Sequence, residues 1–351
     1  MPWKKSIVIG IVIAALVICL FYQQRNRHVM IDSGQHIHLG TFCQVVVVAP
    51  NHKTAQQCVD LAFEQIQTLD AIFSNHRDDS ELAKVNAQAF ERPVKVSDPL
   101  YTVVERAVDV SQRSDGAFDI TVGPLIDLWK QASDANSIPN PEQIREAKSK
   151  VGYQKLLLDP SAKTIQFETE GMKLDLGGIA KGYIIDACIE AIQRGGGVGA
   201  MVNIGGDIRC FGRPKGPTPY WRIGLQNPSK LDSGDPEGIM MVLSLENDAV
   251  ATSGHYRRFF WIDGQKVSHI VEPESGKGSD KVLSTTIIAH RAILADALAT
   301  TVTVMGTDKG LGFIETLPDV QGAIIPGNQE SIRYTEGFEK YIWSNKGQKQ
   351  Q

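Results

Sequence analysis

Two periods of apolar residues run along the chain, one typical of helices and one typical of strands. From Thr54 to Phe73, apolar positions recur at three- and four-residue spacing, which predicts an amphipathic helix. Ser80 can cap a short helix that follows the polar loop beginning at Ser74. Further helices are expected at 99–111, 141–151, 180–194 and 292–304. Helices therefore recur along most of the chain.

Short β-branched runs between these helices predict strands. The stretch from Gln35 to Pro50 is rich in valine, and further strands are expected near 155–158, 164–167 and 282–289. From Trp221 onward, short apolar runs separated by Gly, Pro, Asn and Asp predict antiparallel pairing. A polar, glycine-rich connection is expected after Val304, before a last pair of strands that ends near Trp343. The predicted fold class is α/β with α+β character, with mixed and largely antiparallel sheets and flanking helices.

The amino terminus has the pattern of a membrane-targeting segment. The 17 residues from Ser6 to Tyr22 carry no charge, and two lysines precede them. No A-x-A cleavage pattern follows, and Ile18 stands before Cys19 where a lipoprotein signal has a small residue. An uncleaved anchor is therefore favoured over a cleaved signal, a lipid-modified Cys19 or a buried amino-terminal helix.

Charges on either side of this segment set its expected orientation. Lys4 and Lys5 favour a cytoplasmic amino terminus, whereas Arg25 and Arg27 weaken the bias. We therefore expect the body on the periplasmic side of the inner membrane. The resulting division is an anchor or signal segment at 1–28, one large domain at 29–345 and a polar tail at 346–351.

Composition narrows the classes of function. The 351 residues are 42% hydrophobic and 22% charged, as in an ordinary globular protein, and the formal net charge is −4. Without a basic field or a long Lys/Arg run, nucleic acid is excluded as a partner. The five cysteines include no C-x-x-C, so a zinc or thioredoxin-like site is not expected. Buried free thiols are favoured, and a disulfide among the last four stays open.

The stretch Lys173–Asp186 is the most site-like in the sequence, because an apolar strand is expected to end there in a glycine turn before a helix. Asp175 precedes two glycines that let the backbone approach a ligand, and Lys181 follows one helical turn later as a charge suited to phosphate. The alternative is an ordinary strand-to-helix corner. Other glycine-bearing stretches are Ser114–Trp129, which reads as a site loop, and Asn203–Asp207, a second loop suited to close approach.

One glycine pattern is rejected. Gly195–Ala200 matches G-x-G-x-x-G/A, but it follows a helix and precedes a strand, the reverse of the order that a Rossmann dinucleotide site requires.

Three positions suggest chemistry from their residue types. Asp296 and Thr300 are four residues apart, so a helix would place a carboxylate and a hydroxyl on one face as ligands for magnesium. His269 is a candidate base, and Ser253 lies in a turn whose amides could face an anion. The structural alternatives are a polar stripe on a helix, a packed histidine and a simple hairpin.

Taken together, the motifs resemble the ApbE family of FAD:protein FMN transferases, from about Leu39 to Thr307. The ordered set is far more specific than any single member. It comprises L-G-T (39–41), D-S-E-L-A-K-V-N (79–86), D-G-A-F-D-I-T-V-G-P-L-I-D-L-W (115–129), D-L-G-G-I-A-K-G-Y (175–183), V-N-I-G-G-D (202–207), A-T-S-G (251–254), S-H-I-V-E-P-E-S-G (268–276) and A-D-A-L-A-T (295–300).

The resemblance implies an ApbE-like fold with two lobes around an FAD cleft. It also implies Mg²⁺-dependent transfer of the FMN half of FAD to a threonine hydroxyl of an acceptor protein, with release of AMP. The implied acceptors are flavin-carrying subunits of sodium-pumping or electron-transfer membrane complexes. By position, Asp296, Thr300 and the Gly178 carbonyl would hold the metal. The FAD site would be lined by Leu39, His76, Ala117, Phe118, Asp119, Asp175, Lys181, Ser253 and Val271, with His269 as the candidate base.

Some positions depart from the commoner family pattern. Leu39 stands where the family usually has methionine, His76 where tyrosine is frequent and Gly178 where alanine is typical. Ala299 stands where some members have another acidic residue. The last change favours one metal ion over two. Two rival functions are an FAD pyrophosphatase that makes FMN and AMP with water, and a non-catalytic FAD-binding protein.

Overall fold

The computed structural model describes residues 28–228, 238–254, 259–328 and 331–344. The predicted anchor, apart from its last residue, and the predicted polar tail lie outside these ranges. No helix within them is both long and apolar enough to span a membrane.

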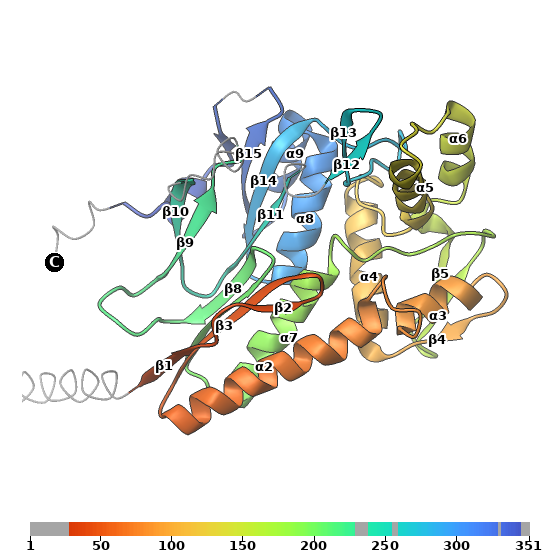
Figure 1. The fold of residues 1–351 in the computed structure, drawn as a ribbon. Coiled ribbons are helices and arrows are strands. Elements are labelled where there is room, and N and C mark those ends of the chain that lie inside the picture. Colours follow the sequence, from red (N-terminus) through yellow and green to blue (C-terminus); the bar gives the residue numbers. More distant parts are fainter. Residues whose placement is uncertain (1–27, 229–237, 255–258, 329–330, 345–351) are drawn as a thin grey trace, which may run out of the picture.

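An antiparallel sheet forms the centre of the described fold (Figure 1). Its nine strands run in the order β1-β3-β7-β8-β11-β14-β15-β16, with β2 paired to β3. The only parallel contact among the described strands and bridges joins Val122 to Lys173, so the predicted largely antiparallel character is confirmed. The strands are β1 (Val29–Asp32), β2 (His36–His38), β3 (Thr41–Ala49), β7 (Gly199–Ile204), β8 (Asp207–Gly212), β11 (Ala249–Ser253), β14 (Val282–Ala289), β15 (Gln321–Pro326) and β16 (Arg333–Tyr334).

Apolar layers cover both faces of this sheet. On β3, Val45 and Val47 pack with helices, whereas Val46 and Val48 pack with a two-stranded sheet on the opposite face. The continuous valine run is explained by this double burial, because alternate side chains of a strand point to opposite faces. The helical layer comprises α2 (His52–Phe73), α4 (Asp98–Arg113), α7 (Ala180–Arg194) and α8 (Ala292–Met305); the opposite layer comprises β9 (Trp221–Gln226) and β10 (Ile239–Leu245).

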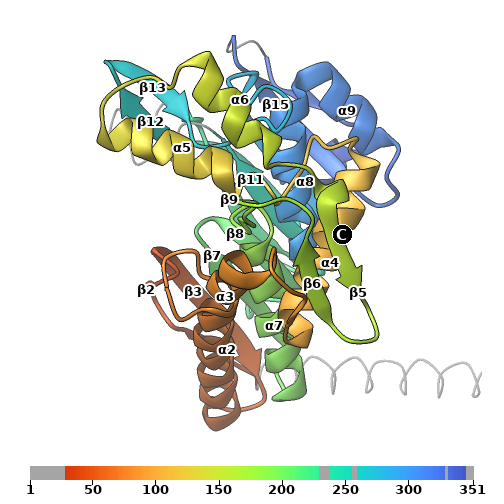
Figure 2. The same cartoon turned by 90° about the vertical axis from the view of Figure 1, so that its right-hand side faces the viewer.

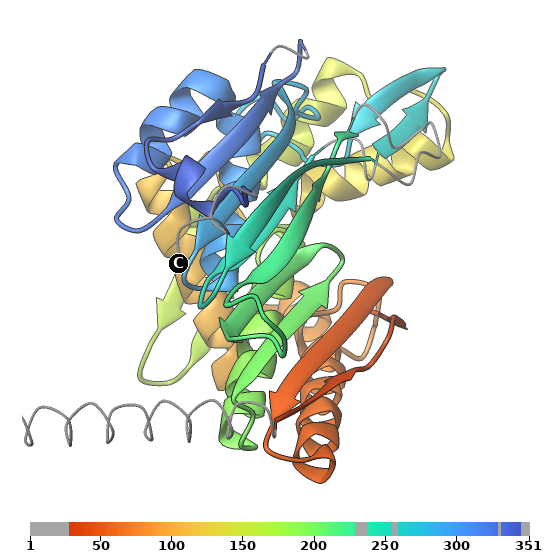
Figure 3. The ribbon, with the colours of Figure 1, turned by 90° about the vertical axis from the view of Figure 1, so that its left-hand side faces the viewer.

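A smaller lobe lies beside the helical layer, as Figure 2 shows. Its core contains Leu125, Trp129, Ile262 and Val271, and the Trp129 indole N–H donates to the carbonyl of Gly276 at 2.8 Å. Figure 3 shows the hairpin of this lobe projecting on the same side of the molecule as β2 and β3. The lobe is built from α5 (Gly123–Asp134), α6 (Pro141–Ser149), β12 (Phe259–Ile262) and β13 (Gln265–Ser268).

Further elements connect the two parts. Ser80 caps α3 (Glu81–Gln88) by accepting a hydrogen bond from the amide of Ala83, as predicted. A three-stranded sheet follows in the order β4-β6-β5, formed by β4 (Val94–Lys95), β5 (Leu156–Asp159) and β6 (Thr164–Phe167). The described cysteines Cys43, Cys58, Cys188 and Cys210 are buried free thiols, so the disulfide left open above is not formed.

Three sequence-based expectations need correction. Residues 173–176 form no strand; a bridge joins Lys173 to Val122, and the amide of Asp175 donates to the carbonyl of Ile120 at 2.7 Å. The expected strand at 35–50 is two strands, because Leu39 and Gly40 adopt positive φ and turn the chain. The connection expected after Val304 contains helix α9 (Thr307–Glu315), in which a side chain on Gly310 would come within 2.6 Å of Val302. Close packing on α8 therefore requires a glycine that, locally, indicates a loop.

The crossing of α7 and α8 also depends on a glycine. A Cβ atom on Gly182 would lie 2.3 Å from the carbonyl oxygen of Ala292 and 2.6 Å from the Cα of Ile293. Both contacts are with backbone, which cannot rotate away. The two helices therefore approach as closely as they do because residue 182 lacks a side chain.

We predict that Gly182→Ala lowers the free energy of unfolding by about 2–3 kcal/mol, because α7 and α8 must move apart. Gly312→Ala is the matched control, since Gly312 is also helical and nothing lies within 4 Å of its added Cβ. The control should change stability by less than about 1 kcal/mol, in the stabilising direction. Urea unfolding measures both, and equal stabilities for the two variants would contradict this packing account.

Candidate active site

A cleft of about 1240 Å³ opens between the main sheet, the helices and the smaller lobe. Pockets for drug-sized ligands are usually about 300–1,000 Å³, so this cleft has room for a dinucleotide. Four chain segments at or beside turns contribute to its wall: 39–42, 117–120, 175–178 and, without the buried Ile204, 203–207. The end of β11 and residues 269–271 close another side.

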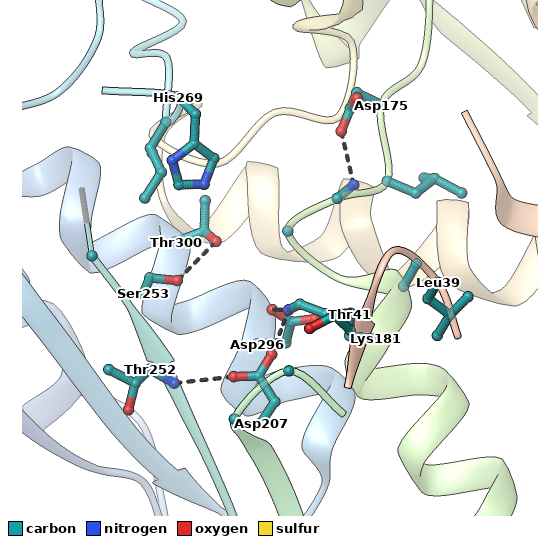
Figure 4. A pocket seen from close by; sticks show the side chains of 18 of the residues that line it. Leu39, Thr41, Asp175, Lys181, Asp207, Thr252, Ser253, His269, Asp296 and Thr300 are labelled. Carbon is teal, nitrogen blue, oxygen red and sulfur yellow. Dashed lines mark hydrogen bonds and ion pairs between the residues drawn. The ribbon is translucent and has the colours of Figure 1, made fainter. Parts of the chain in front are cut away.

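Lys181 joins two acidic residues at the base of the cleft (Figure 4). Its ammonium contacts the carboxylate of Asp207 closely and lies 2.9 Å from Oδ1 of Asp296. Asp296 Oδ2 accepts a hydrogen bond from the amide of Gly182 at 3.0 Å, and Asp207 Oδ1 accepts one from the amide of Thr252 at 3.1 Å. The three charged groups come from α7, α8 and β8, so this cluster ties together the three elements that form the cleft base.

Burial and neighbouring charges shift the pKa values of Lys181 and Asp296. Burial favours the neutral amine of Lys181, but Asp207 and Asp296 more than offset that effect and raise its pKa above the usual value. Burial raises the pKa of the Asp296 carboxyl to about 6, with Lys181 opposing the change and Asp207 adding to it. Lys181 therefore stays charged at neutral pH. Both carboxylates are almost fully buried, with side chains 5% and 3% exposed for Asp207 and Asp296.

The predicted metal ligands lie close together above this cluster. A Cβ atom on Gly178 would be 3.0 Å from the hydroxyl of Thr300, and that hydroxyl lies 3.4 Å from the hydroxyl of Ser253. Thr300 and Asp296 both project from α8 into the cleft. Carboxylate, hydroxyl and carbonyl oxygens are hard ligands of the kind that Mg²⁺ takes, alongside water and phosphate oxygens, so these residues fit the ion. Among the described residues, no cluster of three or more His, Cys, Asp or Glu side chains offers an alternative metal site.

Asp175 holds the glycine turn before α7. Its Oδ1 accepts from the amide of Gly177 at 2.8 Å and its Oδ2 accepts from the Asn75 side chain at 2.6 Å. Burial raises the pKa of this carboxyl, with the Gly177 amide opposing the change. The side chain therefore shapes the turn and lines the cleft at the same time.

Asp119 is mainly a scaffold residue in this structure. Its Oδ1 accepts from the amide and the hydroxyl of Thr121, both at 2.7 Å, and its Oδ2 accepts from the amide of Tyr153 at 2.8 Å. Burial raises its pKa, and the Thr121 and Tyr153 hydrogen bonds oppose the change. These bonds hold the 117–122 loop against the chain that leads into β5.

All the residues predicted to form the site line this one cleft, including the candidate base His269, which lies just after β13 rather than within a strand. Sequence reasoning left other cleft residues out of the predicted set. Asp207 belongs to the V-N-I-G-G-D motif, so its position beside a glycine turn was a usable signal. Thr41 and Thr252 stand in the L-G-T and A-T-S-G motifs, which were usable signals as well. None of the motifs includes the remaining cleft residues of this kind: Asn75, Thr286, Leu225, Met240, Phe259 and Phe260.

We predict that Asp119→Asn lowers the free energy of unfolding without FAD by about 1–3 kcal/mol. The amide would present an N–H group to the Tyr153 N–H, leaving a buried donor unsatisfied. Asp134→Asn is the control, because Asp134 is exposed on α5, and it should change stability by less than about 0.5 kcal/mol. Chemical unfolding measures both. An Asp119→Asn variant of normal stability that no longer binds FAD would instead make Asp119 a direct ligand contact.

Comparisons with known proteins agree on one family. Residues 39–325 match the model of the ApbE family. The FAD:protein FMN transferase of Treponema pallidum is 33% identical over 310 residues, covering 84% of this chain and 84% of that protein. The Vibrio cholerae protein of the same name is 33% identical over 266 residues, covering 75% of this chain and 77% of its own length.

Solved structures match the fold as well as the sequence. A crystal structure of the ApbE protein from Thermotoga maritima is 30% identical, with a TM-score of 0.78, over 90% of this chain and 100% of that chain. The flavin transferase ApbE from Vibrio cholerae superposes with a TM-score of 0.76 at 26% identity, covering 90% of this chain and 99% of that chain.

Proposed function

This chain belongs to the ApbE family, and on that premise we propose that it transfers the FMN moiety of FAD to a threonine hydroxyl of an acceptor flavoprotein, with Mg²⁺ and release of AMP. It is a flavin transferase, like the FAD:protein FMN transferases that match most of its length. The observation that carries the finer proposal is the convergence of Asp296, Thr300, Gly178 and Lys181 in one cleft.

We assign the metal to the oxygens of Asp296, Thr300 and Gly178. When bound there, Mg²⁺ supplies positive charge that neutralises the diphosphate of FAD and polarises its phosphorus–oxygen bonds. Asp296 is suited to this role because its carboxylate, fixed by the Gly182 amide, retains lone pairs on both oxygens. Ala299 adds no second carboxylate on this face of α8, which supports a single ion.

Lys181 and the amino-terminal end of α7 would bind the diphosphate of FAD. Lys181 lies in the first turn of α7, where the helix dipole favours anions. The side chain of Lys181 remains 32% exposed toward the cleft despite its two carboxylate partners. An ammonium at this position stabilises the negative charge that develops on the departing AMP.

The transfer step forms one phosphoester bond and breaks one phosphoanhydride bond. The threonine oxygen of the acceptor bonds to the phosphorus that carries riboflavin, and the bridging bond to the AMP phosphate breaks with its electron pair leaving on AMP. The threonine proton must be accepted by a base. His269 lines the same cleft as Thr300 and Ser253, and we assign it that role.

The cellular setting rests on the amino-terminal segment. We propose that residues 1–28 anchor the protein in the inner membrane and that the catalytic domain faces the periplasm. The acceptors would then be flavin-carrying subunits of sodium-pumping or electron-transfer complexes, whose threonine is reached from that side.

The transfer reaction is tested by intact-mass spectrometry of a threonine-bearing flavoprotein domain after incubation with the full chain, FAD and Mg²⁺. We expect a mass gain equal to FMN minus water on threonine, and its loss with EDTA. Asp296→Asn should slow transfer about a hundredfold or more, as expected for loss of a major electrostatic group. Asp308→Asn is the control, because the Asp308 carboxylate is exposed and paired with Arg333. This variant should transfer FMN at the normal rate.

Other products would identify the rival functions. FMN and AMP formed without modification of the acceptor would indicate an FAD pyrophosphatase. Intact FAD that stays bound without turnover, with this acceptor and a second one, would indicate a binding protein.

His269 can be tested separately from metal binding. We predict that His269→Ala lowers kcat for transfer by about 10²–10⁴-fold while FAD affinity is largely kept, because a base acts on the acceptor hydroxyl and not on FAD. Fluorescence titration of FAD and steady-state transfer kinetics give the two quantities. Near-normal transfer by the variant at saturating FAD would assign the proton to another group.

A further inference from the structure

We propose that Asp207 is a positioning residue that holds the charge of Lys181 so that Asp296 can accept a divalent cation. This inference rests on the proposed metal site and adds a role for a residue outside the predicted ligand set. Its basis is that one ammonium contacts two buried carboxylates, only one of which is a proposed metal ligand.

The two carboxylates are held in matching ways. Each gives one oxygen to a backbone amide, Gly182 for Asp296 and Thr252 for Asp207, and the other oxygen to Lys181. The Lys181 ammonium therefore lies between two fixed anions. Figure 4 shows these side chains converging from separate elements.

The position of Asp207 is built into the main sheet. Gly205 and Gly206 adopt positive φ, and the Asn203 side chain accepts from the amide of Gly206 at 2.9 Å, so the β7–β8 turn is fixed. β8 pairs with β11 only through residues 208 and 209. Two residues beyond Val250 along β11, the amide of Thr252 donates to the Asp207 carboxylate instead of to a strand partner. The sheet thus presents this carboxylate to the cleft.

Charge balance gives Asp207 its role. With one lysine and two carboxylates, the cluster carries a formal charge of −1 and can take up part of the charge of a cation. A divalent ion on Asp296 and the ammonium of Lys181 compete for the same carboxylate, because both are positive. An ammonium held beside buried carboxylates needs an anionic partner, and Asp207 supplies a carboxylate that is not itself a proposed metal ligand. Without Asp207, Asp296 is the carboxylate of this pair that remains to hold Lys181. A metal ion that binds Asp296 must then displace the Lys181 ammonium.

The test measures binding of Mn²⁺ alone, without FAD, from the electron paramagnetic resonance signal of the free ion. We expect Asp207→Asn to weaken Mn²⁺ binding by about tenfold or more, the usual scale for residues that orient a metal ligand. Lys181→Met should tighten Mn²⁺ binding when it is the only substitution, and it should restore binding when it is added to Asp207→Asn. In the Lys181→Met background, Asp207→Asn should change the affinity by less than about threefold, because the competing ammonium is gone.

Two control variants separate the possible causes. Asp248→Asn removes a carboxylate just before β11, outside the cleft lining, and should leave Mn²⁺ affinity unchanged. Asp296→Asn should abolish high-affinity binding. Unfolding curves of every variant show whether a loss of binding reflects a loss of structure, and the double variant keeps the test valid if Asp207→Asn alone is destabilised.

The outcomes distinguish this inference from the proposed function. Unchanged Mn²⁺ affinity in Asp296→Asn would refute the metal site and, with it, the role of Asp207. Loss of binding in Asp296→Asn, together with an equal effect of Asp207→Asn in both backgrounds, would refute only the positioning role, because Asp207 would then act through its charge alone.

Discussion

The buried cluster of Lys181, Asp207 and Asp296 is the interaction on which the rest of the site depends. Its members come from α7, β8 and α8, which meet only because the main sheet and the helical layer share one core. Removing Lys181 would leave two buried carboxylates without their shared countercharge, and breaking a buried ion pair in this way costs about 3–5 kcal/mol. The same charges are useful chemically, because a diphosphate and a metal both require concentrated, fixed countercharge.

Glycine makes this convergence possible. Gly182 allows α8 to approach α7 so closely that its own amide donates to Asp296. Gly178 lies directly against Thr300, where the added Cβ would be 3.0 Å from its hydroxyl. In both positions the missing side chain brings backbone into the site. The D-L-G-G-I-A-K-G-Y motif therefore sets the packing of α7 on α8 and also supplies backbone that lines the cleft.

Much of the fold could be predicted from local signals. The helix at 180–194 and the strand at 282–289 coincide with α7 and β14, because their periods are unbroken and their ends carry glycine or polar residues. The errors arose where tertiary contacts override local preference. Gly310 lies inside a helix because it packs on Val302. Residues 173–176 form no strand because they pair with the 120–122 loop through one bridge and one hydrogen bond, and not with a strand.

The site was predictable to a similar degree. Residues that carry chemistry in a recognisable motif, such as Lys181 and Asp296, were identified, and the cleft gathers them. Asp119 stood in such a motif, yet its carboxylate is used by Thr121 and Tyr153. Leu225 and Met240 had no signal, because a residue of a β-hairpin looks the same in sequence whether it faces a core or a ligand. Spatial neighbours of that kind become visible only when the sheet is assembled.

The most direct measurement is a crystal structure of the full chain with FAD and Mn²⁺, using the anomalous signal of manganese to locate the ion. We expect one strong peak bounded by the Gly178 carbonyl, Asp296 and Thr300, in contact with the FAD diphosphate, with Lys181 still bound to Asp207. A cleft filled by FAD with manganese absent, or bound away from Asp296, would contradict metal-assisted flavin transfer at this site.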